Sequence, residues 1–163
     1  MTRDKTPVTA AVRVLREHGV EFTHHPYEYE ARGGTEVSAR ELGVDEHAVI
    51  KTLIMEDDRK RPLVVLMHGD RAVSTKNLAR FLGVKTVVPC APAVADRHSG
   101  YQVGGTSPFG LRRAMPVYME ATIAELPRIY INGGRRGYLV GVAPADLVRV
   151  LKPQCVSVAV NPG

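Results

Sequence analysis

The chain has 163 residues, of which 44% are hydrophobic and 24% are charged, as in an ordinary soluble protein that buries a core. Its formal net charge of +5 favours an acidic partner such as a nucleic-acid backbone. The N-terminus has no apolar stretch long enough for a signal peptide, and nowhere do about 18 apolar residues run together, so no membrane span and a cytoplasmic location are expected.

Helices and strands alternate in the first half of the chain. A helix is predicted from about Thr6 to His18, with Thr6 as its cap, Pro7 at the first helical position and Gly19 at its end. The elements expected next are an extended stretch at 20–27, a helix at 35–42, and two strands at 48–56 and 63–68 that read as a hairpin.

The second half of the chain predicts more strands than helices. A helix is expected at 75–82, then a strand at 85–88, a helical turn at 93–97 and a short strand at 101–103. Strands at 117–120, 128–132, 138–142 and 156–160 follow, with a last helix at 144–151. No repeat, linker or low-complexity tract divides the chain. The sequence therefore predicts one α+β domain over residues 1–163 with a mixed sheet.

The usual catalytic and metal-binding patterns are missing from the sequence. There is no HExxH pair, and His24 and His25 would point to opposite faces of a strand, so no metal is expected. Cys90 and Cys155 lack CxxC spacing, which favours reduced thiols that serve as small core residues rather than as nucleophiles. The sequence has no GxSxG elbow, P-loop or dinucleotide fingerprint, and this argues against a kinase or a dehydrogenase.

Lys51 interrupts an apolar strand, and the sequence leaves two explanations for it. A buried ammonium group is costly unless it is paired or faces a cavity, so Lys51 could line a binding site. Alternatively its stem lies along the sheet edge and its charged end reaches water. Periodicity alone does not separate these two readings.

Two glycine-rich segments, 104–110 and 133–137, could either be tight turns or expose backbone N–H groups that hold an anion. Each segment is accompanied by a pair of arginines, Arg112 and Arg113 in one case and Arg135 and Arg136 in the other. Glycine turns flanked by cations suit a phosphate ester, including the 3′ end of a tRNA.

Four separated motifs carry a resemblance to a known family: VIKTLI at 49–54, GYQVGGTSPFG at 100–110, IYINGGRRG at 129–137 and APADL at 143–147. In these the chain resembles the YbaK family, free-standing deacylases related to the editing domain inserted in bacterial prolyl-tRNA synthetases. The resemblance runs from about Thr6 to Val160. It implies one α/β domain with a central mixed, partly barrel-like sheet and surrounding helices, and an enzyme that needs no metal or organic cofactor.

The resemblance also implies a reaction and a set of site residues. Mischarged tRNA would be the partner, with Cys-tRNA(Pro) as the substrate and prolyl-tRNA synthetase as a possible second partner. The substrate's own thiol would attack its carbonyl, while Lys51 and the backbone of Gly104 stabilise the charge that develops. The expected substrate-binding residues are Tyr27, Gly105, Thr106, Ser107, Pro108, Asn132, Gly133 and Gly134, and the expected tRNA-binding residues are Arg112, Arg113, Arg135 and Arg136.

Two positions depart from the family pattern and bear on which amino acid is removed. YbaK carries a small hydroxyl residue where this chain has Asn132, and a carboxylate where this chain has Leu139. An acid that could meet the substrate's amino group is thus missing. Two alternatives stay open: a deacylase for another small aminoacyl-tRNA such as Ala-tRNA(Pro), and a non-catalytic module that binds tRNA or a synthetase.

Overall fold

In the computed structural model, which describes residues 7–162, the first helix begins later than the sequence predicts. Helix α1 spans Ala10–Glu17, and Thr9 caps it by accepting a hydrogen bond from the N–H of Val12 at 3.0 Å. Pro7 therefore precedes the helix instead of opening it, and the predicted cap, Thr6, lies outside the described residues. Gly19 follows the helix with φ +65°, as expected for a residue that ends it.

Glycines end three of the other four α-helices. The four are α2 (Gly34–Leu42), α3 (Thr75–Leu82), α4 (Pro92–Ser99) and α5 (Pro144–Leu151). The predicted ends at Gly43 and Gly83 are confirmed, since both residues adopt the left-handed conformation at the helix C-cap. Helix α4 is longer than the single turn expected, because it opens on Pro92 and continues to Ser99, where Gly100 caps it.

The strands form one large mixed sheet and one small ribbon. They are β1 (Thr23–Pro26), β2 (Val49–Asp57), β3 (Pro62–His68), β4 (Ala72–Val73), β5 (Val87–Pro89), β6 (Val117–Glu120), β7 (Ile129–Arg135), β8 (Tyr138–Val142), β9 (Gln154–Val156) and β10 (Ala159–Val160). The large sheet has the order β1-β8-β7-β2-β3-β6-β9, with β5 also paired to β2, and it does not close into a barrel. The pairs β2–β7, β3–β6 and β6–β9 are parallel, so the predicted mixed α/β fold is confirmed.

Two strand predictions need correction. Residues 101–103 form turns instead of a strand, because local groups take their backbone N–H groups: Tyr101 donates to Ser99 Oγ and Val103 donates to Asp96 Oδ1. The predicted strand at 156–160 is split in two. Its first part joins β9 beside β6, and its second part, β10, pairs with β4, a short strand that the sequence did not indicate.

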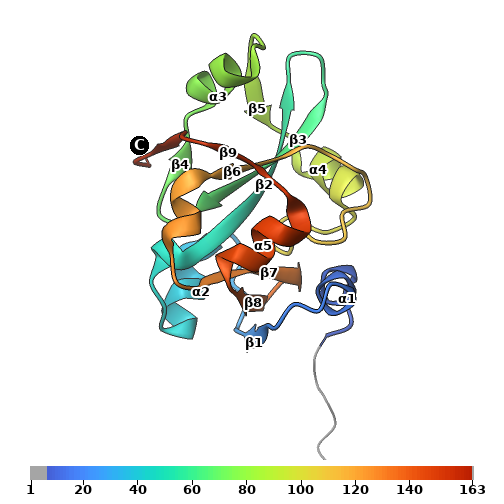
Figure 1. Cartoon of the computed structure of the whole chain (residues 1–163), viewed down its shortest axis with the longest axis vertical. Coiled ribbons are helices and arrows are strands. Elements are labelled where there is room, and N and C mark those ends of the chain that lie inside the picture. The colour runs from blue at the N-terminus through green and yellow to red at the C-terminus, as the bar shows by residue number, and fades with distance from the viewer. Residues whose placement is uncertain (1–6, 163) are drawn as a thin grey trace, which may run out of the picture.

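Strand β3 lies at the centre of the core and is buried along its whole length. Alternate side chains of β3 belong to different clusters: Val64 and Leu66 pack in a cluster with α1 and α5, whereas Val65 and Met67 pack in a cluster with α3. Figure 1 shows α3 at one end of the molecule and the pair β1–β8 at the other. Among residues 7–162, no helix is both long enough and apolar enough to cross a membrane.

Candidate functional site

The site lies where one edge of β2 lacks a neighbouring strand. Strand β7 pairs with β2 at Val49 and Ile50, and β5 pairs with it at Met55 to Asp57. Between these two pairings, residues 51–53 have a strand partner only on the side of β3. The sheet therefore leaves an opening beside Lys51, within an otherwise buried strand.

A cavity of about 640 Å³ occupies this opening. Most of its surface is apolar, and the charged side chains that line it are Glu30, Arg32, Lys51 and Arg136. Helix α2, strand β2, the segment before α4, the loop after α4 and the end of β7 all contribute to its wall. The volume lies within the range of about 300 to 1,000 Å³ that is typical of small-molecule sites.

The two glycine-rich segments, 104–110 and 133–137, meet beside this cavity. A Cβ atom on Gly105 would lie 2.6 Å from the backbone N of Arg136 and 2.9 Å from the carbonyl carbon of Arg135. No side chain can be accommodated at that distance, so glycine is required at position 105 by the neighbouring backbone. The loop after α4 is thereby held directly against the turn between β7 and β8.

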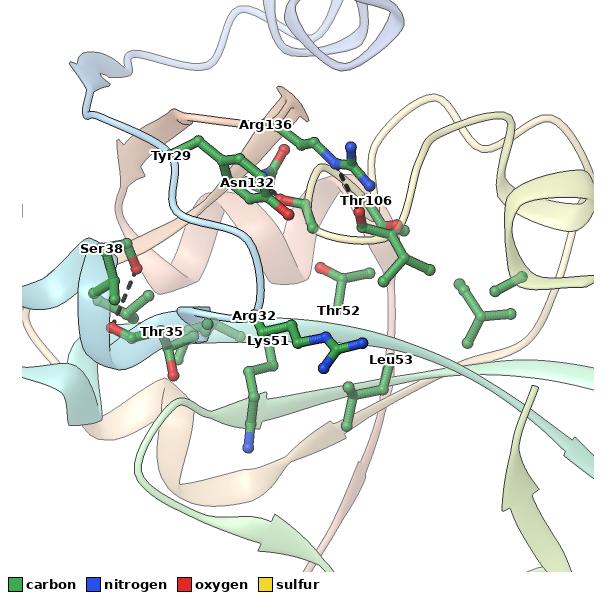
Figure 2. A pocket seen from close by; sticks show the side chains of 18 of the residues that line it. Tyr29, Arg32, Thr35, Ser38, Lys51, Thr52, Leu53, Thr106, Asn132 and Arg136 are labelled. Atoms are coloured by element: carbon green, nitrogen blue, oxygen red, sulfur yellow. Dashed lines mark hydrogen bonds between the residues drawn. The ribbon is translucent and has the colours of Figure 1, made fainter. Parts of the chain in front are cut away.

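The segment that follows β1 packs against the same two loops. The N–H of Tyr27 donates to the carbonyl oxygen of Gly137 at 2.9 Å, and a Cβ atom on Gly104 would lie 2.7 Å from the hydroxyl oxygen of Tyr29. Arg136 stacks over the Tyr29 ring, with 5.2 Å between the guanidinium carbon and the ring centroid. Figure 2 shows Tyr29, Asn132, Arg136 and Thr106 together on one side of the cavity.

Lys51 lines the cavity, but its ammonium group is directed away from the glycine loops. Figure 2 shows Lys51 and Thr52 on opposite faces of β2, with Thr52 on the side of Thr106. The Lys51 ammonium donates to the carbonyl oxygen of Arg71. Burial lowers the pKa of Lys51, while the nearby carboxylates of Glu46 and Asp70 act in the opposite direction.

The carboxylates near Lys51 are themselves held by hydrogen bonds. Glu46 Oε2 accepts from the Thr35 hydroxyl at 2.7 Å, and Asp70 Oδ1 lies 2.7 Å from His47 Nδ1. The His47 ring stacks on the buried His68 ring with 3.7 Å between centroids. This polar cluster fixes the surroundings of Lys51 from the side opposite the glycine loops.

The two cysteines differ in their environments. Cys90 is half-buried and lines the cavity, where burial and the neighbouring Glu56 carboxylate raise its pKa. A thiol with a raised pKa is a poor nucleophile at neutral pH, so this environment fits the expectation that Cys90 does not attack. Cys155 is exposed on β9, and its expected place in the core is therefore wrong. In the described part of the chain, no group of three or more His, Cys, Asp and Glu residues is arranged to hold a metal ion.

The structure brings some of the predicted site residues together at the cavity and leaves others away from it. Those that line it are Tyr27, Lys51, Gly104, Thr106, Asn132 and Arg136. Three others support the loops from behind: Ser107 is fully buried and accepts a hydrogen bond from the N–H of Phe109, Pro108 is buried beside it, and Gly133 packs against the Tyr138 ring. Gly134, with φ +97°, packs against Tyr101 and Thr9.

The four arginines occupy two separate places. Arg135 and Arg136 line a second, smaller hollow next to the cavity, between β1 and the turn after β7. Arg112 and Arg113 are exposed beside the end of α4, where their backbone N–H groups donate to Ser99 and His98, and they do not line either hollow. Leu139, one of the two departures from the family pattern, is buried and lines the cavity.

Several residues that line the cavity were not indicated by the sequence. They are Tyr29, Arg32, Thr35, Ser38 and Thr52. The hydroxyl oxygen of Thr52 is buried and has no hydrogen-bond partner among the described residues. The pair Gly33-Gly34 after Arg32 could have indicated an irregular loop at this place, because paired glycines mark turns. In the structure Arg32 adopts φ +63° in the loop that leads into α2.

Comparisons with known proteins identify what this chain is similar to. A model of the aminoacyl-tRNA editing domain matches residues 30–150. A candidate Cys-tRNA(Pro)/Cys-tRNA(Cys) deacylase of Enterococcus faecalis, EbsC, is 26% identical over 156 residues, which are 94% of this chain and 95% of that protein. The proline–tRNA ligase of Streptococcus equi subsp. zooepidemicus is 28% identical over 104 residues, 63% of this chain but 17% of the ligase.

A solved structure agrees with the sequence comparisons. The crystal structure of a candidate trans-editing enzyme for prolyl-tRNA synthetase superposes with a TM-score of 0.79, covering 97% of this chain and all of that one. The two sequences are 18% identical, so the likeness establishes a common fold.

The contact at Gly105 generates a prediction about stability. Replacing Gly105 with Ala should lower the free energy of unfolding by about 3 kcal/mol, because the added methyl group meets backbone atoms that cannot move aside. Gly19→Ala is the control: its Cβ meets open space, so it should cost only about 1 kcal/mol for the left-handed conformation. Urea unfolding of both variants gives the comparison, and equal losses would mean that the two loops are not in close contact.

Proposed function

Because the chain belongs to the family of aminoacyl-tRNA editing domains of the YbaK type, we propose that it removes cysteine from Cys-tRNA(Pro) in trans. Deacylation of aminoacyl-tRNA is the activity of this family. A mechanism in which the substrate supplies the nucleophile is supported by the cavity beside Lys51. The described residues that line it offer cations and backbone groups, and the pKa of its one thiol, Cys90, is raised. The choice of cysteine is supported by the similarity to EbsC, which extends over almost the whole of both chains.

The chemistry follows from what the cavity contains. The thiol sulfur of the cysteinyl group attacks the ester carbonyl carbon, the bond from that carbon to the ribose oxygen breaks, and the thiol proton ends on the ribose oxygen. The products are cysteine thiolactone and free tRNA. The protein contributes by holding thiol and carbonyl in contact, which is worth effective molarities of roughly 10⁵ M or more in well-oriented systems.

The loop of Gly104 and a cation would stabilise the oxygen as negative charge develops on it. In its resting position the Lys51 ammonium is bound to the carbonyl oxygen of Arg71, so Lys51 would have to leave that contact to reach the ester. A lysine side chain has four rotatable carbon–carbon bonds and can make this movement. Arg32 lines the same cavity and is the alternative source of positive charge.

The bulk of the tRNA would lie outside the cavity, on basic side chains. Arg135 and Arg136 are exposed at the smaller hollow next to the cavity, and they are best placed to contact phosphates near the 3′ end. Arg112 and Arg113 would contact tRNA farther from the reacting ester. The similarity to part of a proline–tRNA ligase supports prolyl-tRNA synthetase as the second partner, because a domain that acts in trans needs access to tRNA(Pro) after it is charged.

The role of the substrate thiol is tested by comparing cysteine with S-methylcysteine on tRNA(Pro). The methylated ester should be cleaved at least about 100-fold more slowly, because its sulfur cannot close onto the carbonyl and lose a proton. Alanine and serine esters should also be poor substrates, whereas Cys90→Ala and Cys155→Ala should leave the rate for cysteine unchanged. Equal rates for cysteine and S-methylcysteine would instead indicate an activated water and a specificity for another small amino acid such as alanine.

The source of positive charge is tested by removing each cation separately. Lys51→Met should lower kcat/KM by about 100-fold, the usual effect of losing one group that stabilises an oxyanion, while Arg32→Met should have a smaller effect. Lys60→Met is the control, since that side chain is 82% exposed in the β2–β3 turn. If Arg32→Met is the more damaging change, the family role has passed from Lys51 to Arg32.

The lowered pKa of Lys51 predicts that deacylation depends on pH. Because burial lowers the pKa of Lys51, its ammonium is lost as pH rises at a lower pH than for an exposed lysine. Activity that depends on this charge should fall as pH increases through that range. Lys51→Arg should abolish the fall, since a guanidinium group stays protonated.

Binding of whole tRNA should weaken as salt increases, because cations on the protein displace counterions from phosphates. Arg135→Gln should reduce the slope of log K against log salt by about 1, as expected for one lost phosphate contact. Arg59→Gln, in the β2–β3 turn, is the matched control and should leave the slope unchanged. Salt-independent binding would exclude an electrostatic tRNA surface, and Arg112→Gln and Arg113→Gln would show whether that surface extends to α4.

A further inference from the structure

One buried side chain, Asn132, connects the two glycine segments. Its Oδ1 accepts hydrogen bonds from the N–H groups of Gly134 at 2.7 Å and Arg135 at 3.0 Å. Its Nδ2 donates to the carbonyl oxygen of Gly104 at 3.2 Å. A single amide therefore joins the end of β7 to the loop after α4.

The orientation of this amide is determined by its partners. Two N–H donors fix the oxygen of Asn132 on the side of the turn, because an NH₂ group in that place could not accept from them. The NH₂ group must then face Gly104. A small hydroxyl at this position is shorter and has a single oxygen, so the three contacts depend on asparagine.

The peptide group between Gly104 and Gly105 is held at both ends. Asn132 binds its carbonyl oxygen, and its N–H, on Gly105, donates to the carbonyl oxygen of Gln102 at 2.7 Å. The preceding peptide group is held at its carbonyl end, where Val103 accepts from Nε of Arg136 at 3.0 Å. Both peptide planes on either side of the Gly104 Cα atom are thus fixed by side chains from β7 and from the turn that follows it.

One group of these two peptides remains available. Within residues 7–162, no acceptor takes the N–H of Gly104, although Gly104 is exposed and lines the cavity. The other three polar groups of the two peptides are all engaged. A free N–H on an otherwise immobilised peptide is the kind of donor that stabilises an oxyanion, since it requires no reorganisation during the reaction.

We propose that Asn132 and Arg136 are positioning residues that hold the peptide groups around Gly104, so that its N–H is presented to the carbonyl oxygen of the substrate. This inference rests on the proposed deacylation. It changes the expected roles of both residues: Asn132 acts on the loop instead of contacting the amino acid, and Arg136 acts on the loop whether or not it also touches a phosphate.

The discriminating substitution is Asn132→Asp. Aspartate keeps an oxygen for the N–H groups of Gly134 and Arg135, but it replaces the donor to Gly104 with a second oxygen that repels the carbonyl. With Cys-tRNA(Pro), kcat should fall by about 10- to 100-fold while KM changes by less than about threefold, because an interaction made in the transition state is lost. A wild-type kcat would overturn the proposal.

The matched control is Thr9→Ala. The Thr9 hydroxyl donates to the carbonyl oxygen of Gly133 at 2.6 Å, so this variant loses a hydrogen bond to the same end of β7 without affecting a contact to Gly104. The control should be less stable, through this bond and the lost helix cap, yet keep the kcat of the wild type. An equal loss of kcat in Thr9→Ala would reduce the role of Asn132 to general support of the turn.

Arg136→Met provides an independent variant at an exposed position, where folding is not at risk. Its activity is measured on 3′-cysteinyl adenosine, which has no tRNA phosphates to bind. If Asn132 and Arg136 act through the same N–H, the double variant Asn132→Asp/Arg136→Met should be only slightly slower than the worse single variant. Multiplicative losses, or a wild-type rate for Arg136→Met on this fragment, would contradict the shared role.

Amide hydrogen exchange separates this inference from the proposed function. Exchange of the Gly105 N–H should accelerate about 10-fold in Asn132→Asp and stay unchanged in Thr9→Ala, because Asn132 restrains the same peptide group. If wild-type protein deacylates no charged tRNA, the proposed function fails, but this exchange measurement still tests the positioning role. Unchanged exchange in Asn132→Asp would overturn it.

Discussion

The contact between Gly105 and the backbone of Arg135 and Arg136 is the constraint on which the arrangement of the site depends. Two loops that are about 30 residues apart in sequence approach each other there without an intervening side chain. Because the backbones touch, short side chains such as Asn132 can span from one loop to the other, and Arg136 can fold back onto Val103. With a larger residue at position 105 the loops would separate, and these bonds would no longer reach.

The sheet provides the second requirement, an opening within an otherwise continuous core. Strand β2 is paired with β3 over most of its length, but its other edge is shared between β7 and β5. The space between those two short pairings is large enough for a cavity, and the strand beneath it stays rigid because β3 is fully buried. A rigid floor with a gap above it suits an enzyme that works by orienting its substrate.

The sequence was informative where local chemistry determines the outcome. Helix α3 was predicted with its observed bounds, since Gly83 ends it in a conformation that other residues avoid. The family motifs likewise located Lys51 and Gly104 at the cavity. What could not be predicted depends on partners far along the chain. The contact of Asn132 with Gly104, the direction of the Lys51 ammonium and the stacking of Arg136 on Tyr29 all follow from the tertiary packing of loops.

Leu139 and Gly104 lie on the wall of one cavity, but Leu139 contributes its side chain whereas Gly104 contributes only main-chain atoms. The N–H that Gly104 offers belongs to the main chain, which is the same whatever residue is encoded, whereas the surface at Leu139 is a side chain that a single codon can change. Under the proposed deacylation, substrate choice could therefore change separately from bond cleavage. A substitution at position 139 would reshape the cavity for another aminoacyl group, while the main-chain geometry at Gly104 would be inherited intact.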